Sequence, residues 1–340
     1  MPIDSQLEVS VGLTQAILET LRTLKVADPE SLLQAAGIDP GQLAKPENRI
    51  PLGQQQMLWQ LATQHSDTTA FGLQFARCIQ PTSFGVLGYM AMNCHTIDEC
   101  FDAVVKYQFL AGQGGEFTLE RDSGRVCLCY TPVNPEHPAT AQRVVAMLAA
   151  NVSFGRWLVG EDFRVARVEF CQQAPAGPAE REEYAEFFAC PVEFGATHNR
   201  LVYNATVLQL TVPNASEELL QLLQERANRL LEGVSQGSGI AARITSLLAT
   251  QLTNRVPDKA RIAAQIGMSE RTLQRRLREE GTSFQEILDN TRHYLARELL
   301  RNTSLALNEV AMQLGFSEPS AFFRAFKKWE GCTPGQYRTA

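Results

Sequence analysis

Two short stretches near the C-terminal end, Ile262-Ala-Ala-Gln-Ile-Gly-Met-Ser269 and Val310-Ala-Met-Gln-Leu-Gly-Phe-Ser317, repeat one pattern at an offset of 48 residues. Each runs from an apolar helical segment to a glycine, then through one apolar residue to a serine. Glycine commonly ends one helix and serine commonly caps the next, so each stretch predicts the turn of a helix-turn-helix motif. The predicted turn residues, with each serine capping the helix that follows, are Gly267, Ser269, Gly315 and Ser317.

The residues after each serine predict two helices that contact DNA. Leu273 and Leu277 mark the inward face of the first helix, and Phe322 and Phe326 mark that of the second. The outward residues, which are the candidate DNA contacts, are Arg271, Gln274, Arg275 and Arg278 in the first helix and Ser320, Arg324, Lys327 and Lys328 in the second. Arg can make bidentate contacts to guanine and Gln to adenine, whereas Lys and further Arg hold phosphates. We therefore expect the first helix to read more bases and the second to contribute more backbone affinity.

A long helix is predicted between the two copies, because apolar residues recur at spacings of three and four from Phe284 to Arg301. Such a helix would be about 27 Å long. Successive major grooves on one side of DNA lie about 34 Å apart, so this connector can hold two recognition helices in adjacent grooves. The C-terminal part is therefore predicted to be all-α, with two tandem helix-turn-helix motifs joined by a linker helix.

The charge distribution indicates a nucleic-acid partner for this end of the chain alone. The net charge is −6, but residues 240–340 hold 15 Lys and Arg against 10 Asp and Glu, whereas residues 1–239 hold 16 against 27. A basic end on an acidic body is expected when only the end approaches phosphates. Glu270, Glu279 and Glu280 can pair with neighbouring arginines, so not every arginine need contact DNA. The alternative is that the outward arginines form only a solvated charged face.

The rest of the chain predicts an α+β domain. Residues up to about 80 show helical spacing, and a helix capped by Thr96 or Asp98 is expected over 97–110. A β-hairpin is expected over 115–131. After the hairpin, the pattern predicts a helix over 140–159, a strand over 165–171, a helix over 179–188 and a strand over 200–210. The order ββαβαβ predicts a mainly antiparallel sheet with helices covering one face.

A further helix is predicted over 216–232, with Ser216 as its N-cap. Its leucines approach a heptad stripe, which suits either a dimer seam or packing on its own domain. The Gly- and Ser-rich residues that follow are typical of a flexible linker. We therefore expect a regulatory and dimerisation domain over 1–233, a linker over 234–239 and a DNA-binding domain over 240–340.

The C-terminal motifs resemble those of the AraC/XylS family over residues 245–339. The resemblance rests on the stretches Ser269-x-x-x-Leu-x-Arg-x-Leu277, Gly315-Phe-Ser-x-x-Ser-x-Phe-x-Arg-x-Phe-Lys327 and Gly331-x-x-Pro-x-x-Tyr-Arg338, and on Arg292, Ala296 and Leu299 of the linker helix. The sequence departs at Leu277, where the family usually has Phe, and at Cys332. The resemblance implies a sequence-specific transcription regulator, an activator or a repressor, that binds double-stranded promoter DNA, contacts RNA polymerase and forms a homodimer.

The N-terminal part resembles a subgroup of that family, the ornithine and arginine utilisation type, whose regulatory domain is called arabinose-binding. The resembling stretches are Thr82-Ser-Phe-Gly-Val-Leu-Gly-Tyr-Met90, Cys190-Pro-Val-x-Phe194 and Asn199-Arg-Leu-Val-Tyr203. This implies control by a small-molecule effector, although the domain need not bind a sugar. Residues 82–89, Tyr107 and Phe109 are candidates for lining an effector pocket, and core packing is the alternative for each. A domain that only dimerises or binds another protein is the alternative function.

No enzyme activity, cofactor or metal site is expected. Gly233-Val-Ser-Gln-Gly237 fits the hydrolase pattern GxSxG but follows a helix instead of a strand. DNA alkyl-transfer repair proteins share the tandem motif but need Cys followed by His-Arg, whereas Pro191 follows Cys190. Cys127 and Cys129 share one strand face, an arrangement that a thiol switch could use. No Cys or His grouping has metal-ligand spacing. No apolar run reaches the roughly 18 residues that cross a bilayer, and no export signal is evident, so we expect no membrane association and a cytoplasmic location.

Overall fold

The structure is a computed structural model that describes residues 7–26, 28–45, 48–122, 124–237, 239–252, 257–302 and 305–339. Its contacts divide the chain into two compact units. Of the described residues, the N-terminal unit comprises those of 8–132 and 139–233, and the C-terminal unit comprises those from 234 onward together with Leu7 and the segment 133–138.

The N-terminal unit is an α+β fold, as predicted, and begins with a mainly helical section. Its first elements are β1 (Glu8–Ser10), α1 (Val11–Thr23), α2 (Pro29–Ala35), β2 (Arg49–Pro51), α3 (Leu52–His65), α4 (Phe71–Cys78), α5 (Val86–Ala91) and α6 (Ile97–Ala111). The predicted cap of α6 is confirmed for Thr96, whose side chain accepts a hydrogen bond from the Glu99 backbone N–H. The antiparallel pair β1–β2 was not foreseen within this section. Its strands are too short for alternation to reveal them.

A five-stranded sheet forms the rest of the unit, in the order β3-β4-β7-β5-β6. The elements of this part are β3 (Gly115–Asp122), β4 (Arg125–Pro132), α7 (Thr140–Val159), β5 (Arg167–Phe170), α8 (Pro178–Phe188), β6 (Val192–Phe194) and β7 (Arg200–Asn204). The pairing is antiparallel except between β5 and β6. The predicted hairpin is β3–β4, and Ser123 of its predicted turn lies outside the described residues.

Two details of the sheet differ from the prediction. The short strand β6 was missed, and the strand expected over 200–210 ends at Asn204, where a 3-10 helix (Ala205–Gln209) begins. Both segments are too short for the two-residue alternation of a strand to be distinguished from a loop.

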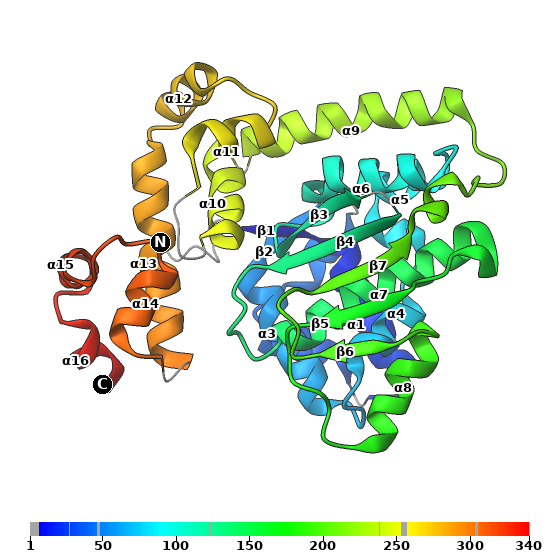
Figure 1. Cartoon of the computed structure of the whole chain (residues 1–340), viewed down its shortest axis with the longest axis horizontal. Coiled ribbons are helices and arrows are strands. Elements are labelled where there is room, and N and C mark those ends of the chain that lie inside the picture. The colour runs from blue at the N-terminus through cyan, green and yellow to red at the C-terminus, as the bar shows by residue number, and fades with distance from the viewer. Residues whose placement is uncertain are drawn as a thin grey trace. The chain divides into compact units, whose positions relative to one another are not determined.

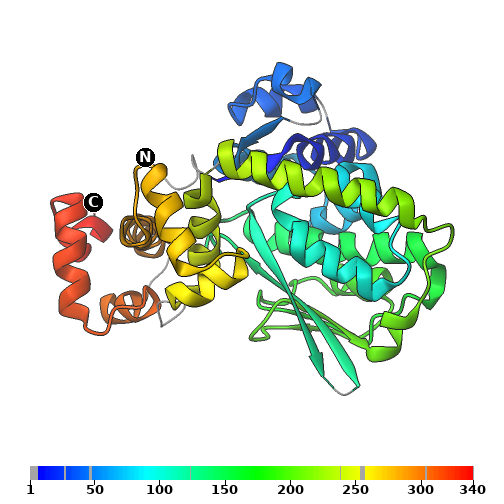
Figure 2. The same ribbon diagram turned by 90° about the horizontal axis from the view of Figure 1, so that it is seen from above.

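The core of the N-terminal unit lies between the sheet and the helices on one of its faces. Helices α1, α3, α4 and α7 lie behind the sheet in Figure 1, and the turned view of Figure 2 agrees. Trp59 packs edge-on against Phe71 with ring centroids 5.5 Å apart. Helices α4 and α7 approach closely because Gly72 has no side chain, and a Cβ there would lie 2.9 Å from the Cβ of Val145. This packing places α7 beside the cavity described below.

Helix α9 (Glu217–Gly237) begins where predicted, and the Leu219 backbone N–H donates to the Ser216 hydroxyl over 3.3 Å. It does not end at Glu232, however, but continues through Gly237. The prediction of irregular structure from residue 234 is therefore wrong up to Gly237, while Ser238 lies outside the described residues. A single helical glycine costs only about 1 kcal/mol, so Gly233 does not stop the helix.

The C-terminal unit is all-α, as predicted. Its helices are α10 (Gly239–Gln251), α11 (Lys259–Gln265), α12 (Glu270–Glu279), α13 (Phe284–Asn302), α14 (Leu307–Gln313), α15 (Pro319–Glu330) and α16 (Pro334–Thr339). Helices α11–α12 and α14–α15 form the two helix-turn-helix motifs, and α13 is the predicted linker helix between them (Figure 1). Within the described part of the chain, no helix is long and apolar enough to cross a membrane.

Candidate nucleic-acid interface and effector cavity

The first motif is built as its sequence predicts. Gly267 has a φ of +74°, the left-handed conformation in which glycine ends a helix without strain. The Ser269 hydroxyl then accepts a hydrogen bond from the Thr272 backbone N–H over 3.2 Å, which confirms it as the N-cap of α12. Leu273 and Leu277 are buried, as expected for the inward face.

The outward face of α12 carries the four predicted side chains Arg271, Gln274, Arg275 and Arg278, all of them exposed. They line one open hollow of the surface together with Thr272 and Glu279. Arg275 forms an ion pair with Glu279 at 3.9 Å, but these side chains are 69% and 61% exposed. Such an exposed pair is weak, so a phosphate or a guanine can replace it.

Among the described residues, Glu280 forms no ion pair with a neighbouring arginine and has a different role. Its carboxylate accepts hydrogen bonds from the backbone N–H groups of Ile240 and Ala241, over 2.6 Å and 2.9 Å. It thereby satisfies the N-terminal end of α10, where a negative charge is stabilised by the helix dipole. The arginines of α12 are thus not neutralised by this acidic residue.

The second motif repeats this geometry with one correction. Gly315 ends the first helix with a φ of +68°, and Phe322 and Phe326 are fully buried. Ser317, however, is not the N-cap of α15. The helix begins at Pro319, so the N-cap is Glu318, whose side chain makes no capping hydrogen bond.

The proline explains why the helix begins at that residue. Its fixed φ suits the first helical position, and a proline also disfavours helical geometry in the residue before it. Ser317 therefore stays one residue before the cap. The predicted outward residues Ser320, Arg324, Lys327 and Lys328 are all exposed. In the described part of the chain, the three basic ones have no ion-pair partner.

A residue of the linker helix fixes the second motif in place. The Arg292 guanidinium donates hydrogen bonds to the carbonyl oxygens of Leu314 (3.0 Å) and Gly315 (2.8 Å), and its carbon lies 4.1 Å from the centre of the Phe316 ring. Burial lowers the pKa of Arg292 below its ordinary value. The sequence had suggested Arg292 only as part of a family pattern, and the structure assigns it to the turn that precedes α15.

The N-terminal unit contains a mainly apolar cavity with an empty volume of about 870 Å³, its open mouth included. Its aromatic lining residues are Trp59, Phe75, Phe84, Phe117, Tyr130 and Phe154. Its amide and charged lining residues are Gln55, Gln108, Arg143 and Asn151. This combination of an apolar wall with a few polar groups is typical of small-molecule sites.

The predicted pocket residues are only partly brought to this cavity. Phe84 and Leu87, from the stretch 82–89, line it. Tyr107 and Phe109 do not, and the Tyr107 hydroxyl instead donates to the Asn228 side chain over 3.0 Å. Sequence reasoning missed Arg143. The available signal was a lone charge directly before an apolar run of helix α7.

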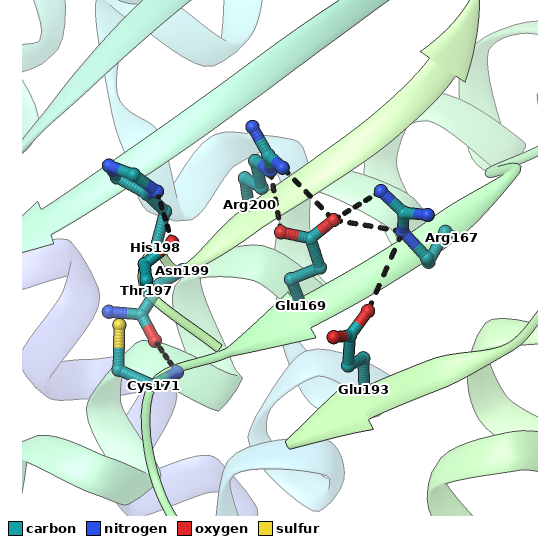
Figure 3. Close-up of polar contacts among 8 residues, drawn as sticks. All are labelled: Arg167, Glu169, Cys171, Glu193, Thr197, His198, Asn199 and Arg200. Carbon is teal, nitrogen blue, oxygen red and sulfur yellow. Dashed lines mark hydrogen bonds and ion pairs between the residues drawn. The ribbon is translucent and has the colours of Figure 1, made fainter. Parts of the chain in front are cut away.

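The face of the sheet opposite the helices carries an ionic cluster, shown in Figure 3. Glu169 of β5 is 4% exposed and accepts hydrogen bonds from Arg200 of β7 (2.7 Å) and Arg167 of its own strand (2.8 Å). Burial alone would raise the pKa of Glu169, but the hydrogen bonds from Arg200 and Arg167 outweigh it and hold the pKa below its ordinary value. Arg167 also reaches Glu193 of β6 at 3.9 Å, so the cluster joins three neighbouring strands.

Cys127, Cys129 and Cys190 lie in surroundings that disfavour the thiolate. Burial raises the pKa of the Cys127 thiol, and it raises the pKa of Cys129 and of Cys190 to about 11. A reactive thiolate needs the opposite shift, so these values disfavour a thiol switch at β4. Among the residues that the structure describes, no three His, Cys, Asp or Glu side chains are grouped to hold a metal ion.

Two helix-turn-helix motifs with basic outer faces, joined by one helix, define a DNA-binding protein. Comparison with known proteins agrees. Residues 27–212 match the family model described as the arabinose-binding domain of AraC transcription regulators, and residues 262–340 match a helix-turn-helix domain. The chain belongs to the AraC family and is a DNA-binding transcription regulator with an N-terminal ligand-binding domain.

Relatives match along nearly the full chain. The ornithine utilization regulator of Pseudomonas aeruginosa is 29% identical over 332 residues, which are 98% of this chain and 96% of that protein. The regulator VirS of Mycobacterium tuberculosis is 27% identical over 92% of this chain and 91% of its own length. The crystal structure of the transcriptional regulator CdpR from Pseudomonas aeruginosa matches 93% of this chain and 98% of its own, with a TM-score of 0.44 and 24% identity.

Proposed function

We propose that this regulator is controlled by a small-molecule effector that binds in the cavity of the N-terminal unit. The observation that carries the proposal is the cavity itself, with its aromatic wall and its few polar groups. An effector regulates only if it binds two conformations of the protein with unequal affinity. The proposal therefore includes a second conformation in which this cavity is altered.

We further propose that α12 and α15 contact DNA. Arg271, Gln274, Arg275 and Arg278 would contact base edges from α12, because Arg and Gln are the side chains best suited to guanine and adenine. The contacts proposed for α15 are Ser320, Arg324, Lys327 and Lys328, with more of them directed to phosphates. The exposure of every one of these side chains supports the assignment.

The glycines Gly267 and Gly315 and the serines Ser269 and Ser317 retain their proposed place in the turns. Helix α13 has 19 residues and so is about 28 Å long, which supports the proposed spacing over two successive grooves.

The proposal also includes a homodimer. Leu219 and Leu222 of α9 are 45% and 57% exposed, although both are large apolar side chains. An exposed apolar stripe at helical spacing suits a helix–helix seam between two copies. The same face would serve if the N-terminal unit acts only in dimerisation or in binding another protein, which remains the second candidate function.

Further parts of the proposal rest on the family resemblance. The dimer would activate transcription by contacting RNA polymerase at promoter DNA, in the cytoplasm. The division into a regulatory domain (1–233) and a DNA-binding domain (240–340), connected through residues 234–239, also belongs to the proposal.

The effector proposal is tested by thermal unfolding of the full chain against a broad metabolite panel. A ligand at 100 times its Kd stabilises the folded protein by about 2.7 kcal/mol. The expected result is at least one compound that raises the Tm of the wild type but not that of Ala150→Phe, which fills the cavity. Ala141→Phe, on the exposed side of the same helix, is the matched control. A panel with no stabilising compound, or with equal effects on all three proteins, would argue for the dimerisation function.

A further inference from the structure

Arg143 is a buried cation in the wall of the cavity. It lies in the first turn of α7, is 3% exposed and is followed by the buried residues Val144 and Val145. One guanidinium nitrogen, Nη2, donates to the carbonyl oxygen of Gly114. The second terminal nitrogen, Nη1, has no hydrogen-bond partner among the residues that the structure describes. A buried donor left without a partner costs about 1–3 kcal/mol, and more when it is charged.

Among the residues that the structure describes, no acidic side chain pairs with this charge. The lining of the cavity contains neither Asp nor Glu, and across the described ranges no carboxylate oxygen lies within 4.0 Å of the Arg143 guanidinium. Glu8 and Glu116 are the acidic residues next to lining residues in the sequence. The Glu8 carboxylate forms an ion pair with Arg49 at 3.5 Å, which leaves Glu116. It stands between Gly115 and Phe117, which both line the cavity, so the alternation of a strand directs its side chain to the opposite face. The cavity wall thus carries a positive charge and no negative one.

The remaining polar lining groups are largely occupied by the protein itself. The Gln108 side chain accepts from the Phe117 N–H over 2.5 Å and donates to the Phe117 carbonyl oxygen over 3.0 Å. The Gln55 amide donates to the Thr14 hydroxyl over 3.0 Å. Arg143 therefore stands out in this lining as the polar side chain with a buried donor still to be satisfied.

The backbone beside Arg143 is shaped to admit polar groups at this end of the cavity. A Cβ at Gly114 would lie 3.1 Å from Nη2 of Arg143, and a Cβ at Gly115 would overlap the Tyr130 hydroxyl. The two glycines thus let the guanidinium and the phenol lie against the start of β3. Both Arg143 and Tyr130 line the cavity.

We infer that the effector is a small organic acid, with its carboxylate bound by Arg143 and an aliphatic or aromatic body lying against the apolar wall. The inference rests on the proposed function, namely that the cavity holds the effector. A carboxylate would supply both the negative counter-charge and the hydrogen-bond acceptor that the Arg143 guanidinium lacks in this cavity. A charge-assisted hydrogen bond of this kind is strong in an apolar site. An amino acid with a second ammonium group would find no carboxylate in the lining, and a sugar would find few free partners for its hydroxyls.

The inference is tested by calorimetric titration of the full chain at neutral pH with octanoate, octanol and octylamine, which share one body and differ in charge. Hydrocinnamate is the aromatic acid, and L-arabinose and L-ornithine represent the other ligand classes. We expect the acids to bind at least about tenfold more tightly than the alcohol, a difference of about 1.4 kcal/mol. We expect octylamine, arabinose and ornithine not to bind at the same concentrations.

Variants of Arg143 connect the selectivity to the residue. Arg143→Met keeps the apolar stem, so it should reduce the affinity for octanoate to about that for octanol while the affinity for octanol stays unchanged. Arg143→Lys should restore part of the preference for the acid. Arg125→Met, on the exposed end of β4, is the matched control and should bind like the wild type.

Two results would overturn the inference. One is equal affinity for octanoate and octanol in the wild type, or a preference for the acid that survives in Arg143→Met. The other is stabilisation by arabinose, ornithine or another compound that is not an acid, lost in Ala150→Phe, while no acid binds. This second result would contradict the inference that the effector is an acid, but it would support the proposal that the cavity binds the effector. Failure of every compound in both panels would contradict both.

Discussion

Replacement of Arg292 by Met should detach the second helix-turn-helix motif from the linker helix. The substitution removes two hydrogen bonds from a charged donor, to Leu314 and Gly315, and the stacking of the guanidinium on Phe316. Each such hydrogen bond contributes about 1.5–3 kcal/mol and the cation–π contact about 0.5–2 kcal/mol. Because Met retains the apolar stem and Arg292 is only half-buried, we expect a net loss of about 3 kcal/mol.

Hydrogen exchange measured by mass spectrometry reports this loss locally. A loss of about 3 kcal/mol should speed exchange in peptides covering α14 and α15 by about 100-fold, with α11 and α12 unaffected. Arg292→Lys should recover less than half of the protection, since Lys has no planar fork to reach two carbonyls. Arg276→Met, at an exposed position of α12, is the control. Wild-type exchange rates in α14 and α15 of Arg292→Met would refute this role of Arg292.

Three further predictions concern the turns, the sheet and the DNA backbone. Ser269→Ala should cost about 1 kcal/mol in thermal unfolding and Ser317→Ala nearly nothing, because only Ser269 caps a helix; equal losses would contradict the corrected start of α15. Glu169→Gln should cost about 2 kcal/mol at neutral pH. The fold lowers the pKa of Glu169, so the stabilisation that its carboxylate gives is fully present above pH 4.5, the ordinary pKa. This stabilisation is lost as the pH falls through the lowered pKa of the folded protein. In urea unfolding, the free energies of unfolding of the wild type and Glu169→Gln should therefore converge at acidic pH. A difference in free energy that stays constant with pH would show that the ionised carboxylate is not its source. Lys327→Ala should reduce the salt dependence of DNA binding by about one unit of slope without altering base preference, and an altered preference would place Lys327 on a base.

The C-terminal unit could be predicted well because its signals are local. A glycine that ends a helix, a serine that caps the next and leucines at a spacing of four define the first motif within a dozen residues, and Ser269 and Leu273 lie where expected. The prediction for Ser317 failed because it assumed that the second motif copies the first. Pro319 sets the start of α15 instead, and the sequence contained that proline.

The N-terminal unit was predicted less completely because its decisive contacts are distant in the sequence. The cavity places Arg143 of α7 against Gly114 at the start of β3, and no periodicity relates these positions. A strand of three residues such as β6 is too short for alternation to reveal it. Helix α9 passes Gly233 because a glycine weakens a helix without ending it.

Selection of bound sites from a random pool of double-stranded DNA tests most directly whether α12 reads the sequence of a promoter. The wild type, Arg275→Ala and Arg276→Ala are compared at one salt concentration. Both arginines are exposed on α12, but Arg276 lies off the face formed by Arg271, Gln274, Arg275 and Arg278. We predict a motif spanning about two helical turns for the wild type and Arg276→Ala, and the same motif with one position relaxed by about 1–3 kcal/mol for Arg275→Ala. Identical motifs for all three proteins, or no enriched motif for the wild type, would contradict the reading face proposed for α12.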